Sequence, residues 1–189
     1  MTDNDKDLRR ENEELRRALR ELTRISAAMT STLHLEELLG LIMSSATELL
    51  DAETSSLMLV DEETGDLVFA LSPDVAEQRI PAGRGIAGSV VERGNGEIVA
   101  DPSRDERFFA GIDESTGVQT RNIIAAPLRS KDKTVGVVEV INKRDGDFSD
   151  RDLELATALA NQAAIAIENA RLYSSLADAV VTSRLSYRL

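Results

Sequence analysis

The sequence predicts an α+β domain in which an antiparallel sheet packs against helices that lie mostly on one face of the sheet. Two hairpins are indicated, over residues 54–71 and 122–141, because each contains two apolar runs of strand length separated by a short polar turn. Apolar residues recur at helical spacing before the first hairpin and after the second, over 35–50 and 150–185. The predicted order of elements is α-β-β-α-β-β-β-α.

The N-terminal segment, residues 1–31, shows a heptad pattern typical of a two-stranded coiled coil. Its seam consists of Leu8, Leu15, Leu22 and Met29 at d positions and Asn12, Leu19, Ser26 and Leu33 at a positions. An Asn at an a position fixes parallel register, so the pattern favours a homodimer. The alternative is a single solvated helix, which would be only marginally stable because the segment is short and highly charged.

The remaining elements follow from local patterns. In chain order, the sequence predicts strands at 54–60 and 67–71, an irregular stretch from Pro73 to Arg84, and a short helix at 86–93. These are followed by a short strand at 97–100, a loop at 101–120 with one helical turn near 106–109, and strands at 122–129 and 134–141. Ser149 and Asp152 form a capping-box pattern that opens the last helix. That helix has two apolar stripes, so we expect one to pack against the core and the other to form a subunit interface. We also expect the helix to extend beyond the domain after Tyr173.

Composition excludes several classes of function. The chain has 189 residues and a formal net charge of −12, which argues against binding to nucleic acid or to an anionic membrane. It has no Cys and one His, so we expect no disulfide, no thiol chemistry, no metal site and no catalytic triad. The N-terminus does not resemble a signal peptide and no apolar run has the length of a membrane span, which favours a cytoplasmic protein.

Residues 83–88, GRGIAG, match the dinucleotide-binding pattern G-x-G-x-x-G. The preceding residues do not form a buried parallel strand, which that fingerprint requires, so a nucleotide-binding βαβ unit is not expected. Two interpretations remain open. The glycines provide a tight turn without a ligand, or the helix that they start offers free N–H groups to an anion.

Short polar side chains surround the second hairpin on an otherwise apolar framework. They are Asp113, Thr116, Thr120 and Glu139, and this composition is typical of a small-molecule site. Lys143 leaves a strand and Asp152 lies in the first turn of the last helix, so we expect a structural ion pair that braces the strand against the helix.

Residues 32–173 resemble the GAF domain family. The motifs that carry the resemblance are RIPAGRGIAGSVVERG, EIVADPSRDERF, STGVQTRNIIAAPL, GVVEVINK and AIAIENARLY, in the order expected of the family. The sequence is most similar to the cyclic-nucleotide-binding members, which carry an Asn-Lys…Phe-x-x-x-Asp-Glu signature. Asn142, Lys143, Phe148 and Asp152 match this signature, and Leu153 replaces its final Glu.

The resemblance implies a PAS-like antiparallel sheet of five to six strands and a ligand site. The implied contacts are Ser56, Ser72, the backbone N–H groups of Ile86 and Ala87, Phe109 stacking on a purine, Asp113, Thr116, Thr120 and Glu139. The implied ligand is cAMP or cGMP, with no cofactor required. Pro73 stands where related sites have an acid that contacts the base.

The predicted function is that of a non-catalytic sensory domain. Its three segments are a coiled-coil helix (1–31), the GAF domain (32–173) and a C-terminal helix extension (174–189), and it relays ligand binding through dimer helices to a downstream effector domain or protein. The alternative is a ligand-free dimerisation and signal-relay module with a vestigial pocket. One GAF branch reduces free methionine sulfoxide, but that chemistry needs Cys thiols, which this chain lacks.

Overall fold

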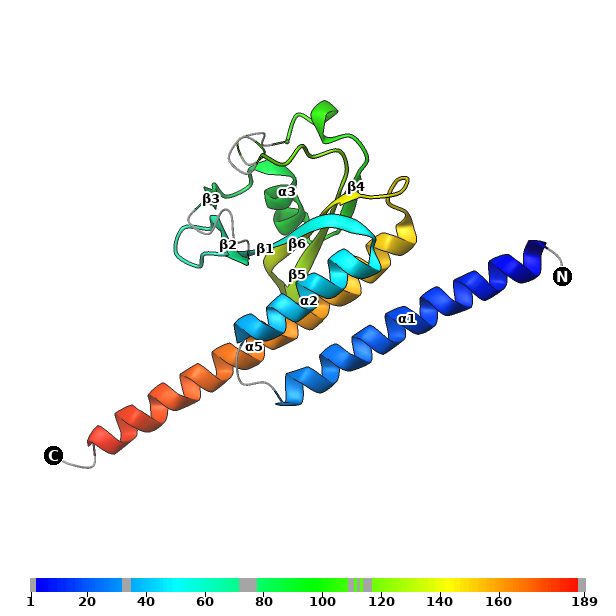
Figure 1. Cartoon of the computed structure of the whole chain (residues 1–189). Helices are drawn as coiled ribbons and strands as arrows, with labels where there is room; N and C mark the ends of the chain where they lie inside the picture. Colours follow the sequence, from blue (N-terminus) through cyan, green and yellow to red (C-terminus); the bar gives the residue numbers. More distant parts are fainter. Residues whose placement is uncertain are drawn as a thin grey trace.

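The computed structural model describes residues 3–31, 35–71, 78–108, 111, 113 and 117–186. In this part of the chain the strands form one six-stranded antiparallel sheet with the order β3-β2-β1-β6-β5-β4 (Figure 1). The strands are β1 (Ala52–Val60), β2 (Leu67–Leu71), β3 (Arg79–Ile80), β4 (Glu97–Val99), β5 (Ile123–Ser130) and β6 (Lys133–Lys143). The predicted α+β class and antiparallel sheet are confirmed.

The central pair of strands, β1 and β6, sets the register of the sheet. Ser56 lies opposite Glu139, and Glu139 in turn lies opposite Ala125 of β5. Because facing residues in a ladder point to the same side, these three positions form a row on one face of the sheet. Pro127 has no N–H to donate, and β4 pairs only with Ile123–Ala125.

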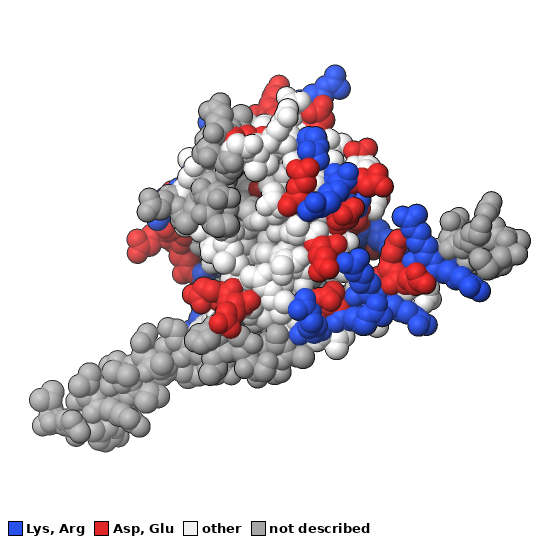
Figure 2. Space-filling view, in the orientation of Figure 1, with Lys and Arg blue, Asp and Glu red and all other residues white. Residues whose placement is uncertain are grey.

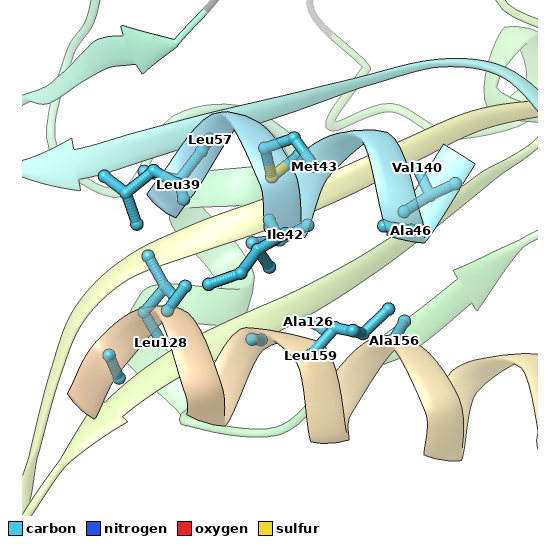
Figure 3. Packing of buried hydrophobic residues seen from close by; sticks show 14 of the residues in the cluster. Leu39, Ile42, Met43, Ala46, Leu57, Ala126, Leu128, Val140, Ala156 and Leu159 are labelled. Atoms are coloured by element: carbon cyan, nitrogen blue, oxygen red, sulfur yellow. The ribbon is translucent and has the colours of Figure 1, made fainter. Parts of the chain in front are cut away.

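Two long helices cover one face of the sheet. They are α2 (Leu35–Leu49) and α5 (Asp150–Ser186), and their apolar stripes meet the alternate residues of β1, β5 and β6 (Figure 3). The buried residues labelled there are Leu39, Ile42, Met43, Ala46, Leu57, Ala126, Leu128, Val140, Ala156 and Leu159. Small residues on α5 allow it to lie close to the sheet, as the predicted stripe indicates.

The third helix of the domain, α3 (Gly85–Arg93), lies on the opposite face (Figure 1). Its buried residues Ile86, Ala87 and Val90 form a second apolar cluster with residues of the strands. The strand residues of this cluster are Met58, Leu67, Phe69, Ile80, Val99, Ile123, Ala125 and Val137. The expectation that helices lie mostly on one face therefore holds for α2 and α5, while α3 is the exception.

The start of α5 is fixed by the predicted capping box. Asp152 accepts hydrogen bonds from the backbone N–H and the hydroxyl of Ser149, both at 2.8 Å, and the backbone N–H of Asp152 donates to Ser149 Oγ at 3.3 Å. The helix continues past the sheet at its C-terminal end (Figure 1). Ile165 and Leu172, seven residues apart on α5, are 46% and 56% exposed.

The N-terminal helix, α1 (Asp3–Ser31), packs against α2 and α5 of its own chain. Ile25, which lies outside the predicted heptad seam, is fully buried in this contact. Arg17 reaches Glu48 of α2 at 3.3 Å. The seam residues Leu15 and Leu19 are 54% and 66% exposed, so the intrachain contact leaves that stripe uncovered.

Two local features differ from the sequence predictions. The stretch expected to be irregular contains the two-residue strand β3, and the predicted loop contains the 3₁₀ helix Pro102–Arg104. Phe109, at the end of the helical turn predicted near 106–109, lies outside the described residues. In the described ranges no helix combines the length and apolarity needed to cross a membrane. Basic and acidic side chains lie next to one another on the face seen in Figure 2, especially over α1.

Candidate functional site

The α3 face of the sheet carries polar side chains in the middle of an apolar surface. We call Ser56, Asp113, Thr120 and Glu139 the polar cluster. Ser56 and Glu139 lie opposite each other at the centre of the sheet, on the face that also carries Met58 and Val137. Polar groups at such a position lose water on folding and need hydrogen-bond partners to compensate for that loss.

Ser56 does not have such a partner. Its side chain is 7% exposed, and its Oγ has no hydrogen bond with any residue that the structure describes. A buried hydroxyl left in this state costs about 1–3 kcal/mol. The neighbouring Ser55, on the other face, bonds instead to Thr47 Oγ1 at 2.8 Å and to the Met43 carbonyl at 3.2 Å.

Glu139 is a carboxyl group in an apolar setting. Burial, and to a smaller extent the nearby carboxylate of Asp113, together raise the pKa of Glu139 from the ordinary 4.5 to about 7. No hydrogen bond or ion pair joins the Glu139 carboxyl to another described residue, so burial is not offset. Glutamate at this position is therefore expected to exchange a proton near neutral pH.

Asp113 and Thr120 are brought together, as the sequence predicts, but they bond to each other. Asp113 accepts a hydrogen bond from the Thr120 backbone N–H at 2.8 Å and another from the Thr120 hydroxyl at 2.6 Å. The hydroxyl proton of Thr120 is thus used within the protein. Ser72, Phe109 and Thr116, the other predicted contacts, lie outside the described residues, as does Pro73.

The start of α3 explains the GRGIAG motif. Gly83 and Gly85 have φ values of +68° and +77°, a region that favours glycine. A Cβ at Gly88 would lie 2.8 Å from the Gly83 carbonyl carbon, so close packing requires glycine there. The strand before the motif is β3, which pairs antiparallel with β2, and this excludes a dinucleotide-binding βαβ unit.

The first turn of α3 also has the properties of an anion site. The N-cap residue, Arg84, makes no side-chain capping bond, and the first turn contains no acidic residue. The N–H groups of Ile86 and Ala87 lie in this turn, where an α-helix has no internal acceptors for them. Their side chains are buried in the α3-side cluster, which fixes the direction of the helix axis.

Lys143 and Asp152 form the predicted structural tie. Lys143 Nζ lies 3.0 Å from both carboxylate oxygens of Asp152, donates to the Leu50 carbonyl at 3.2 Å, and lies 5.4 Å from the centre of the Phe148 ring. Burial alone would raise the pKa of Asp152, but hydrogen bonds from Ser149 and Lys143 outweigh it and lower that pKa. The signature residues thus join the end of β6 to the start of α5.

The side chain of Asn142 joins three segments of the chain by hydrogen bonds, a role that the sequence does not reveal. It has φ +61°, rare for a residue other than glycine, and its side chain accepts from the Arg121 N–H at 2.7 Å. It donates to Glu53 Oε2 at 2.8 Å and to the Gln119 carbonyl at 2.9 Å. These bonds attach the segment 117–122, which carries Thr120, to the central strands. The Asn-Lys pair is the only sequence signal for it.

A second network, also missed, surrounds Arg107. Its guanidinium contacts Glu97 of β4 at 2.7 Å, Asp105 at 2.6 Å and Ser89 of α3 at 3.1 Å. Arg93 of α3 joins the same Glu97 at 2.7 Å. The Arg107 guanidinium lowers the pKa of Asp105 to about 2. This network fixes α3 relative to the sheet, and its partners are too scattered in sequence to be paired by spacing.

The described residues contain no group of His, Cys, Asp and Glu side chains suited to a metal ion. The α3 face of the sheet carries neutral and acidic hydrogen-bonding groups, and the helix that covers this face has an uncapped N-terminus. Such an arrangement suits binding of a small molecule that has both an anionic and a polar part.

Comparison with known proteins places this arrangement in a family. A family model described as a GAF domain matches residues 32–168. The chain is 33% identical over 162 residues to the probable 3',5'-cyclic phosphodiesterase pde-5 of Caenorhabditis elegans, across 78% of this chain and 22% of that protein. It is 37% identical over 99 residues to dual 3',5'-cyclic-AMP and -GMP phosphodiesterase 11 of Drosophila melanogaster, across 51% and 7% respectively. The chain therefore spans a small part of each relative.

Solved structures agree on the fold. The GAF domain from a Coxiella burnetii phosphoenolpyruvate-protein phosphotransferase matches with a TM-score of 0.74 at 22% identity, covering 84% of this chain and 96% of that one. Free methionine-R-sulfoxide reductase from Neisseria meningitidis, in complex with its substrate, matches with a TM-score of 0.68 at 23% identity, covering 80% and 89%. Because the family model spans most of the sheet and its helices, and solved GAF domains share their arrangement, the chain belongs to the GAF domain family.

Proposed function

We propose that this chain is a regulatory domain that binds a cyclic nucleotide, cAMP or cGMP, on the α3 face of its sheet. The observation that carries the proposal is the buried Ser56 hydroxyl, which has no hydrogen-bond partner among the described residues and lies opposite Glu139, whose carboxyl makes no hydrogen bond with them either. A ligand edge with donors and acceptors would supply the hydrogen bonds that the described residues do not. The relation to two cyclic-nucleotide phosphodiesterases supports this class of ligand.

The cyclic phosphate would bind at the first turn of α3. The N–H groups of Ile86 and Ala87 point along the helix axis, and the positive end of the helix dipole favours an anion there. No basic cluster is required for a single negative charge. The base would then lie over the centre of the sheet, where Glu139 and Ser56 face it.

Isothermal titration calorimetry with cAMP and cGMP tests the proposal. We expect binding of at least one of them, and thermal stabilisation by the same nucleotide. At a ligand concentration of a hundred times Kd, linkage adds about 2.7 kcal/mol to the free energy of unfolding. Adenosine, which lacks the phosphate, is the matched control and should bind more weakly. Absence of both heat and stabilisation with either cyclic nucleotide would contradict the proposal.

A second candidate function is dimerisation and signal relay without a ligand. It is favoured by the exposed apolar residues on the two helices that pack side by side, Leu15 and Leu19 on α1 and Ile165 and Leu172 on α5. In both functions we propose a homodimer formed through these helices. Analytical ultracentrifugation of Leu19→Asp and Leu172→Asp should show a shift from dimer to monomer. Glu154→Gln, an exposed change elsewhere on α5, should leave the dimer intact.

A further inference from the structure

Two carboxyl groups and one hydroxyl lie near one another on the α3 face, and no ion pair joins either carboxyl to a basic side chain in the described part of the chain. Glu139 lies directly opposite Ser56, which is 7% exposed and has no hydrogen-bond partner among the described residues. Asp113 is close enough for its charge to act on Glu139. A negative charge close to a carboxyl group in an apolar site raises the cost of ionising that group, so Asp113 disfavours ionisation of Glu139.

The hydrogen bonds decide which carboxyl holds the proton. Asp113 accepts two bonds from Thr120, at 2.8 and 2.6 Å, and donors of this kind stabilise the ionised form. Glu139 accepts none from the residues described, so burial favours its neutral form. The proton therefore belongs on Glu139, the carboxyl that has no hydrogen-bond donor among the described residues.

The other neighbours of Glu139 do not supply a compensating charge. Across the sheet it faces Ser56 of β1 and Ala125 of β5, neither of which titrates. Beyond Ala125, Glu97 of β4 is already neutralised by Arg93 and Arg107, at 2.7 Å each. The first turn of α3 contains no acidic side chain, so it adds no negative charge of its own.

We propose that Glu139 carries a proton when an anionic ligand occupies this face, and that binding of the ligand is coupled to proton uptake at Glu139. The ligand part rests on the proposed function. A ligand phosphate adds a second negative charge to a site that already holds Asp113, and like charge disfavours ionisation of Glu139 still more. The affinity for the anion must then increase as pH falls, by linkage. A neutral Glu139 also gives the ligand one O–H donor and one carbonyl acceptor beside the Ser56 hydroxyl.

The shared proton can be tested without any ligand. In the ¹³C NMR spectrum, the Glu139 side-chain carboxyl should titrate with a midpoint near neutral pH. The midpoint should move to lower pH in Asp113→Asn, because the like charge is removed, and should stay unchanged in the exposed variant Glu154→Gln. A Glu139 midpoint near that of an ordinary glutamate would overturn the proposal, as would a midpoint that ignores Asp113→Asn.

Proton uptake is tested by calorimetry with cAMP and cGMP in two buffers of different ionisation enthalpy. At pH 7.5 the binding heat of the wild type should depend on the buffer in the sense of proton uptake, and the heat of Glu139→Gln should not. The wild-type affinity should be about fivefold higher at pH 6.5 than at pH 8.5, while that of Glu139→Gln should be nearly constant. Binding without buffer dependence overturns the uptake step. If neither nucleotide binds, the proposed function and the uptake step fail together, whereas the NMR midpoint still decides where the proton lies.

Discussion

Replacement of Glu139 by Gln should stabilise the ligand-free protein, and the gain should increase with pH. The pKa of Glu139 rises from 4.5 to about 7 on folding, mainly through burial and then through Asp113. A group whose pKa is raised on folding binds more protons in the folded state than in the unfolded state. Glu139 therefore does not lower the free energy of unfolding below pH 4.5, and it lowers that free energy progressively as the pH rises from 4.5 to about 7. Gln has no charge to desolvate and avoids this cost.

The size of the effect follows from the same values. Each pKa unit corresponds to about 1.4 kcal/mol, so the raised pKa of Glu139 costs the folded state about 3 kcal/mol at pH 8 and about 1–2 kcal/mol at pH 5.5. The unfolding free energy of Glu139→Gln should exceed that of the wild type by these amounts. Titrating groups that do not interact with Glu139 are common to the two proteins and cancel in the difference.

Urea unfolding at pH 5.5 and pH 8 measures the gain directly. Protein concentration must be equal in all samples, because dissociation of a dimer would make the midpoint concentration-dependent. Glu154→Gln on the exposed face of α5 should change stability by less than about 0.5 kcal/mol at both pH values. A gain for Glu139→Gln that does not grow with pH, or a loss at pH 8, would refute the assignment of Glu139 as a buried, unpaired carboxyl.

Three other substitutions test separate contacts. Ser56→Ala should leave the free protein unchanged or stabilise it by up to about 1 kcal/mol, since it removes an unpaired hydroxyl, yet weaken nucleotide binding measured by calorimetry. Asn142→Ala should lower the unfolding free energy by about 2–4 kcal/mol, because it loses the hydrogen bonds of the side chain and keeps the strain of φ +61°. Asn142→Gly loses the same hydrogen bonds without that strain, so its loss should be about 1 kcal/mol smaller. Lys143→Met should lower it by about 2–3 kcal/mol in the same urea assay, because Asp152 keeps a charge with less than a fifth of its side chain exposed; a change under 0.5 kcal/mol would show that the tie is dispensable.

The sequence predicts those parts of the fold that depend on local pattern. Alternation and turn residues locate both hairpins, and the Ser149–Asp152 spacing locates the start of α5. The strand β3 is missed because two residues cannot show a period. The side of the sheet on which α3 packs is also not predicted, since an amphipathic helix fits either face equally well.

The residues of the candidate site can likewise be predicted from the sequence, but their contacts with one another cannot. The resemblance to the family selects Ser56 and Glu139, but only the β1–β6 register shows that they face each other. The bond between Asp113 and Thr120 depends on how a loop folds back on itself, which no periodicity encodes. The left-handed backbone of Asn142 and the ion-pair network of Arg107 depend on tertiary contacts between segments far apart in the chain.

The central strand β6 connects the proposed site to the helix that leaves the domain. It carries Glu139 at its middle, and its last residue, Lys143, contacts Asp152 of α5 at 3.0 Å. Lys131, in the turn between β5 and β6, contacts Glu168 of α5 at 3.2 Å. These two attachments differ in strength. Lys131 is 80% exposed, and an exposed ion pair contributes little, whereas the Lys143 and Asp152 side chains are each 18% exposed and Lys143 also binds the Leu50 carbonyl. The firmer contact between β6 and α5 is therefore the one at the first turn of α5, where the capping box also holds the start of the helix.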